Sequence, residues 1–157
     1  MVEDEHITRI MNDCEKALQN TMVKVDKLLK NTISEKVYKP RIPKVYVRSY
    51  TFENAWYVGQ ASRHFSSVSQ NLEYEPTRMG YSGSLFIHGN GSRDRRNIMA
   101  SILEKQEINT QNSDFGGALN IPKDDKEGYW EEFKKELDTE LYKYLDKELG
   151  KYGIRRC

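Results

Sequence analysis

The stretch from residue 6 to residue 36 contains neither glycine nor proline, and this constrains the fold more than any other feature. Glu3, Asp4 and Glu5 precede it, and acidic side chains are favourable at a helix N-terminus. A helix over this stretch would have a wide apolar face, and that face would be exposed to solvent unless a sheet or another helix covered it. The apolar residues recur at steps of three and four, which predicts one face of a long helix: Ile7, Ile10, Met11, Cys14, Leu18, Met22, Val25, Leu28, Leu29 and Ile33.

A second amphipathic helix is predicted near the end of the chain. Gly150 and Gly153 fit its C-terminal stop. Charged residues on the opposite face predict a solvated surface with pairs at three- and four-residue steps, rather than an acid/base dyad. The apolar stripe comprises Trp130, Phe133, Leu137, Leu141, Tyr144, Leu145 and Leu149. The charged face comprises Glu131, Glu132, Lys134, Lys135, Glu136, Asp138, Glu140 and Lys143.

Between the helices, the sequence predicts extended chain and short strands. Pro40 and Pro43 end the first helix, and residues 37–44 should be extended because a residue before proline disfavours the helical region. Residues 45–52 are rich in β-branched and aromatic side chains, which indicates a short strand or an extended arm. We therefore define residues 37–52 as the arm. Further strands are predicted over residues 55–58, 66–74 and 84–88.

The remaining middle region is predicted to hold one short helix and one long loop. Residues 89–91 form a turn, and Ser92 is a suitable N-cap for a helix over residues 93–105. Residues 106–128 are polar and form a loop; loops of this size are usually functional or are ordered by a partner. The expected architecture is one α+β domain over residues 1–157, with a small antiparallel sheet between the helices.

Composition narrows the class of protein. The net charge of +1 gives no global attraction to nucleic acid or to an acidic membrane. Ten tyrosines and two tryptophans suit a surface that a partner later covers, although tyrosine also fills half-exposed strand positions. No apolar run reaches the length of a membrane helix, and residues 1–6 are too acidic for a signal peptide. Cys14 and Cys157 are expected to be reduced thiols in a cytoplasm.

The sequence offers few residues for catalysis or metal binding. His6, His64 and His88 are far apart, and none has a His, Cys or carboxylate partner at metal-ligand spacing. No hydrolase, metalloprotease, phosphate-loop or dinucleotide motif occurs. We expect a protein that is not an enzyme, with no catalytic residues, no cofactor and no metal.

A possible anion contact lies at the predicted middle helix. A glycine turn that opens a helix offers free backbone N–H groups, and Arg93, Arg95 and Arg96 add positive charge. Alternatively, the glycines form only a tight turn and Asp94 neutralises the same helix end. The lysine and hydroxyl residue of a phosphate loop are absent.

The arm carries the most distinctive surface pattern, because basic and aromatic residues alternate along it. Such a pattern can stack on and neutralise a single strand of nucleic acid. It can also anchor a neighbouring subunit, since Arg and Tyr are favoured at interfaces. The near-neutral net charge favours a subunit interface, and a nucleic-acid-binding module using residues 38–50 with Arg93–Arg96 is the alternative. The predicted interface residues are Tyr38, Arg41, Tyr46, Arg48, Tyr50 and Trp56.

In order along the chain, these segments resemble the tail-completion (neck) proteins of long-tailed bacteriophages, a family often labelled minor capsid or putative tail-component proteins. Residues 46–52 are similar to the family's Tyr-x-Arg-Thr-Gly-x-Leu segment, with Ser49 and Tyr50 in place of its Thr and Gly. Residues 88–99 look like its loop and short helix, and residues 129–154 like its closing helix.

The resemblance implies a structural subunit of the virion that joins tail to head. It would form a ring of six or twelve copies at the head–tail junction. Its partners would be further copies of itself, the phage connector proteins and the tail-tube or tail-terminator proteins. DNA would pass through the lumen of the ring, and no membrane, metal, cofactor or catalysis would be involved.

Overall fold

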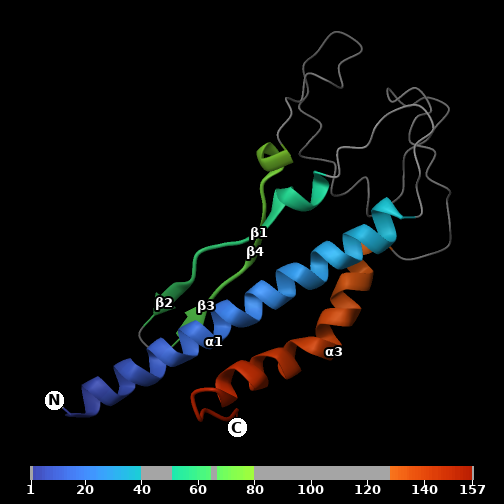
Figure 1. The fold of residues 1–157 in the computed structure, drawn as a ribbon. Coiled ribbons are helices and arrows are strands. Elements are labelled where there is room, and N and C mark those ends of the chain that lie inside the picture. Colours follow the sequence, from blue (N-terminus) through green and yellow to red (C-terminus); the bar gives the residue numbers. More distant parts are fainter. Residues whose placement is uncertain (1, 40–50, 65–66, 80–127, 157) are drawn as a thin grey trace, which may run out of the picture.

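The computed structural model describes residues 2–39, 51–64, 67–79 and 128–156, and these form the α+β fold that the sequence predicts (Figure 1). The chain order is α1 (Val2–Ile33), the π-helix η1 (Ser34–Tyr38), the 3-10 helix η2 (Phe52–Ala55), β1 (Trp56–Val58), β2 (Ser62–His64), β3 (Ser67–Ser69), β4 (Leu72–Tyr74), the 3-10 helix η3 (Pro76–Met79) and α3 (Tyr129–Gly150). The strand predicted over 84–88, the helix over 93–105 and the loop over 106–127 lie outside the described residues.

Helix α1 is the central element of the fold, with the β-strands on one side and α3 on the other (Figure 1). The apolar stripe predicted from the sequence is buried only in its later part: Leu29 and Ile33 are fully buried, whereas Ile7 is 55% exposed and Ile10 39%. The reason is length. Helix α1 has 32 residues and α3 has 22, so α3 cannot cover the first turns of α1.

The helical conformation continues beyond α1, and the prediction of extended chain from residue 37 was wrong for residues 37–39. Ser34–Tyr38 is π-helical, and Lys39 keeps helical angles (φ −62°, ψ −44°) while its N–H donates to the carbonyl of Ser34 at 2.9 Å. Burial of Val37, which is 5% exposed, outweighs the weak preference against helix before Pro40. At the other end of the arm, the predicted strand or extended chain was also wrong for residues 51–52, because Thr51 has helical angles (φ −99°, ψ −5°) and the buried Phe52 begins the 3-10 helix η2. Residues 40–50 of the arm lie outside the described residues.

The four strands form one bent antiparallel ribbon. Strand β1 pairs with β4, with Trp56 opposite Tyr74, and β2 pairs with β3, with Ser62 opposite Ser69. Between these two ladders, residues 59–61 face only residues 70–71, so one strand carries an extra residue, as in a β-bulge. The strand predicted over 55–58 is confirmed over 56–58, while Ala55 belongs to η2. The single strand predicted over 66–74 is instead two strands.

The two faces of the β1–β4 ladder differ in character. Trp56, Val58, Leu72 and Tyr74 pack against the core, whereas the hydroxyl of Tyr57 on the other face donates a hydrogen bond to Glu73. This alternation is the two-residue period of a half-buried strand.

The β2–β3 ladder has little apolar burial of its own, and its three β2 residues are all exposed. Arg63 attaches it to α1: its Nη1 lies 2.6 Å from Oδ1 of Asn12 and 3.9 Å from Oε2 of Glu15. An isolated two-stranded hairpin is marginally stable in water, so this contact with α1 supports the far end of the ribbon.

An aromatic cluster closes the core where the ribbon, α3 and the C-terminal end of α1 meet. The Phe52 ring meets Tyr129 edge to face, with centroids 5.5 Å apart, and Trp56 stacks on Trp130 at 4.9 Å with an angle of 17°. Each such pair contributes about 0.5–1.5 kcal/mol beyond its burial. The cluster consists of Phe52, Trp56, Tyr74, Tyr129, Trp130 and Phe133.

Helix α3 matches its predicted extent and its predicted stop. Gly153 has φ +71°, and the N–H of Ile154 donates to the carbonyl of Leu149 at 3.1 Å, so the chain turns back on the last helical turn. Of the predicted stripe, Phe133 and Leu149 are buried, while Trp130 and Leu137 are half-buried. Glu148 is also buried, although the sequence gave no prediction for it.

Candidate functional site

Two of the six predicted interface residues, Tyr38 and Trp56, lie within the described residues, and both lie at the base of the arm. The other four, Arg41, Tyr46, Arg48 and Tyr50, lie outside the described residues, as do the three arginines of the possible anion contact, Arg93, Arg95 and Arg96. The nucleic-acid alternative depends on these same residues and stays a prediction.

Tyr38 links the two ends of the arm. Its ring packs against the core, and its hydroxyl accepts a hydrogen bond from the backbone N–H of Glu53 at 3.2 Å. Phe52, beside Glu53, is 6% exposed and belongs to the aromatic cluster. The chain therefore enters and leaves the segment 40–50 at one place, next to the C-terminal end of α1.

Trp56 is half-buried and is held mainly by ring packing. It stacks on Trp130 and lies 4.9 Å from the ring of Tyr74, at an angle of 50°. Its Nε1 is buried and has no hydrogen-bond partner among the described residues. Tyr38 and Trp56 thus anchor the base of the arm to the core, and only part of each ring remains available to a partner.

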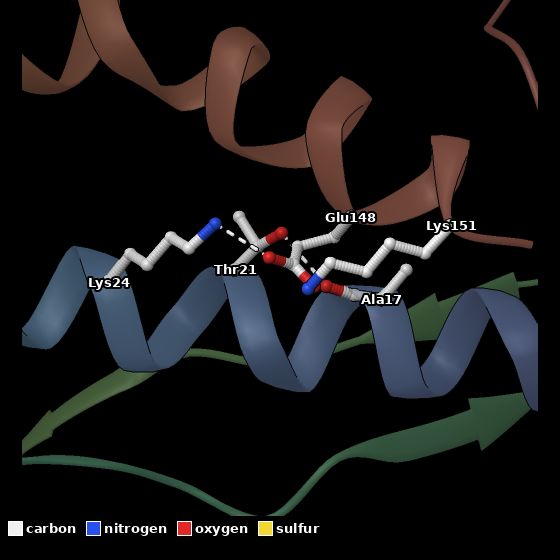
Figure 2. A network of polar contacts seen from close by, with 5 residues as sticks. All are labelled: Ala17, Thr21, Lys24, Glu148 and Lys151. Atoms are coloured by element: carbon white, nitrogen blue, oxygen red, sulfur yellow. Dashed lines mark hydrogen bonds and ion pairs between the residues drawn. The ribbon is translucent and has the colours of Figure 1, made fainter.

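The most buried carboxylate in an ion pair of the described residues joins α1 to α3 (Figure 2). Glu148 is 2% exposed, and its two carboxylate oxygens each accept a bond of 2.6 Å, one from Lys24 and the other from Lys151. We call these three residues the clamp. Beside it, the buried hydroxyl of Thr21 donates to the carbonyl of Ala17 at 2.8 Å.

The lysines of the clamp keep the carboxylate ionised despite its burial. The hydrogen bonds from Lys151 and then from Lys24 lower the pKa of Glu148 from its ordinary value of 4.5 to about 2, and desolvation opposes this shift. Two cationic donors favour the charged form of this carboxylate, so it stays ionised near neutral pH. Its role is to hold α3 against α1 rather than to transfer protons.

Two further polar contacts continue from the clamp along the same helix pair. Thr32 donates to Glu136 at 3.2 Å, and Lys36 lies 3.4 Å from Glu132. The sequence placed both glutamates on a solvated face, and the structure corrects this, because Glu136 turns toward α1 and Glu132 toward Lys36 of η1. Glu148 could have been found from the sequence, since it lies three residues after Leu145, within the apolar stripe of α3.

The described residues contain no group of three or more His, Cys, Asp or Glu side chains that could hold a metal ion. His6 and His64 are exposed, and His88 lies outside the described residues. In the same part of the chain, no helix combines the length and the apolar character needed to cross a membrane.

The comparisons with known proteins add no relative. The resemblance to phage neck proteins therefore stays a prediction from the sequence. No family model, curated protein or solved structure matches this chain.

Proposed function

We propose that this protein is a non-enzymatic structural subunit of a tailed-bacteriophage virion, a tail-completion or neck protein that forms a ring at the head–tail junction. It acts through contacts with further copies of itself and with connector and tail-tube or tail-terminator proteins, while DNA passes through the ring. The order of segments along the chain supports this proposal, and the arm is the working surface.

One observation carries the assignment to the arm: both ends of its central segment are fixed to the same point of the core. Tyr38 before the segment bonds the backbone of Glu53 after it, and Phe52 is buried beside them. Bringing the ends of a loop together costs conformational entropy. In this protein the ends of the segment are already held together in the folded domain, before any partner binds. Less ordering is then needed when the arm binds a neighbour.

The test replaces two predicted anchors together, Tyr46→Ala and Arg48→Ala. Loss of an aromatic or Arg anchor typically weakens an interface by about 2 kcal/mol, so both changes should weaken the contact by about two orders of magnitude or more. In a phage that lacks the wild-type protein, the variant should yield unjoined tails and filled heads by electron microscopy, with a reduced infectious titre. Its circular dichroism should match the wild type.

The matched control is Val23→Ala with Lys27→Ala, two exposed positions on α1, and it should give the normal titre. Wild-type titre from the Tyr46/Arg48 variant would remove the arm from the assembly surface. If the variant instead loses a salt-dependent affinity for an oligonucleotide and still joins heads to tails, the arm is a nucleic-acid-binding segment.

A further inference from the structure

The N-terminal end of α1 exposes apolar side chains that belong to the core stripe of that helix. Residues 5–10 are all exposed, including Ile7 at 55% and Ile10 at 39%. Ile7 lies about five turns before Val25, which is 2% exposed, and so occupies the same side of the helix. In Figure 1 this end extends beyond both the ribbon and the end of α3. We call residues 2–11 the tip.

The C-terminal end of the molecule is positively charged. Residues 141–156, which we call the shoulder, carry five basic side chains against two acidic ones. Both acids are already bound, Asp146 by Arg156 and Glu148 by the lysines of the clamp. Lys147 and Arg155 are exposed and form no ion pair or hydrogen bond with the described residues, so the shoulder presents unneutralised positive charge.

The shoulder also has an aromatic anchor. Tyr142 is 55% exposed, and the guanidinium carbon of Arg156 lies over its ring, 4.2 Å from the centroid. Exposed Tyr and Arg side chains in contact are the residue types that concentrate at interface centres. The shoulder therefore combines an aromatic surface with a positive rim.

We propose that the tip of one copy docks on the shoulder of the next copy, head to tail. By sequence, the tip has a net charge of −2, which complements the net charge of +3 on the shoulder. Because the tip is part of a continuous helix that leads away from its own shoulder, a second copy has to supply the partner surface (Figure 1).

A second copy fits both surfaces better than other occupants do. Acidic residues at a helix start and basic residues at a helix end each suit the helix dipole, but the dipole does not account for two exposed isoleucines. Nucleic acid or an anionic membrane would suit the shoulder and be repelled by the tip. A contact between two different patches repeats from copy to copy and can close into a ring, so this inference rests on the proposed function and details it.

The test reverses charge on each side separately. The tip variant is Glu3→Lys with Glu5→Lys, and the shoulder variant is Lys147→Glu with Arg155→Glu. In sedimentation velocity over a concentration series, each variant alone should self-associate at least about tenfold more weakly than the wild type. An equimolar mixture of the two variants should recover association. In the mixture, the positive tip of one variant can bind the negative shoulder of the other, and the unaltered tips can bind the unaltered shoulders.

Two further variants make the result specific. Ile7→Ser with Ile10→Ser should weaken association without changing the charge. Its mixture with the shoulder variant should form only pairs, through the unaltered tip of one variant and the unaltered shoulder of the other, whereas the two charge-reversed variants together should form longer assemblies. Lys27→Glu, at an exposed position in the middle of α1, should associate like the wild type. Circular dichroism checks that every variant is folded.

The inference is overturned if the wild type stays monomeric at all concentrations, if the reversed variants associate normally, or if their mixture remains as weak as each alone. A shoulder variant that loses only oligonucleotide binding would assign that surface to nucleic acid and also reject the inference. Failure here and failure of the proposed function are separable, since the Tyr46/Arg48 variant tests head–tail joining independently of the tip and shoulder.

Discussion

Replacement of Phe133 by alanine is expected to lower the free energy of unfolding by about 3–5 kcal/mol. Phe133 is 1% exposed, and its ring lies 5.2 Å from that of Trp130 in the aromatic cluster that joins α3 to the rest of the core. Alanine would remove the buried ring and leave a cavity where α1, the ribbon and α3 meet. Urea denaturation followed by tryptophan fluorescence measures the change.

The matched control for Phe133 is another aromatic residue on the same helix. Tyr142 is 55% exposed and contacts Arg156 through its ring face, so Tyr142→Ala should cost less than about 1 kcal/mol. Similar losses for the two variants would mean that α3 does not pack through the aromatic cluster.

Substitution of Glu148 by glutamine should lower the melting temperature by roughly 5 °C or more at pH 7, because both lysines of the clamp then lack their anionic partner between two helices. Differential scanning calorimetry measures it. Glu140→Gln, which breaks the more exposed pair with Lys143, is the control and should change the melting temperature by no more than about 2 °C.

The effect of Glu148 should also depend on pH in a defined direction. Its pKa is about 2 in the folded protein against an ordinary 4.5, so the ionised carboxylate stabilises the fold fully above pH 4.5. That stabilisation is lost as the pH falls from 4.5 towards 2, and the difference in melting temperature between wild type and Glu148→Gln should shrink over this range. A difference that stays constant from pH 7 to pH 2 would contradict the assignment.

Periodicity predicted the elements that depend on local pattern. Both helices are present, because a three- and four-residue repeat of apolar side chains specifies a helix face whatever covers it. Helix α3 has the expected extent, whereas α1 begins at Val2, before the acidic residues that were expected to precede it. The strand at Trp56–Val58 follows from its β-branched and aromatic residues.

The elements that depend on distant partners could not be predicted. Helical continuation to Tyr38 requires the core that buries Val37, and the division of residues 66–74 into two strands requires a partner strand with one extra residue. No local pattern reports either condition. Similarly, the apolar stripe of α3 contains Glu148, but the partner that Glu148 finds in Lys24 depends on where α1 lies.

For the candidate site, the sequence identified the arm but not how it is attached. The alternation of basic and aromatic residues singled out Tyr38 as a contact residue, and Trp56 was also predicted to contact a partner. The structure places both at the base of the arm, where they pack against the core of their own chain. The hydrogen bond between Tyr38 and Glu53 joins residues fifteen positions apart and depends on two helical turns that the sequence did not predict.

The attachment of β2 to α1 depends on the number of residues that connect the two ladders of the ribbon. Side chains alternate between the faces of a strand, so removing one residue from positions 59–61 would rotate β2 by half a turn relative to β1. Arg63 would then point away from Asn12 and Glu15, while the pairing of Trp56 with Tyr74 would be unaffected. A change in the length of residues 59–61 should therefore leave the β1–β4 ladder and its aromatic contacts intact. The same change should break the attachment of the β2–β3 ladder to α1.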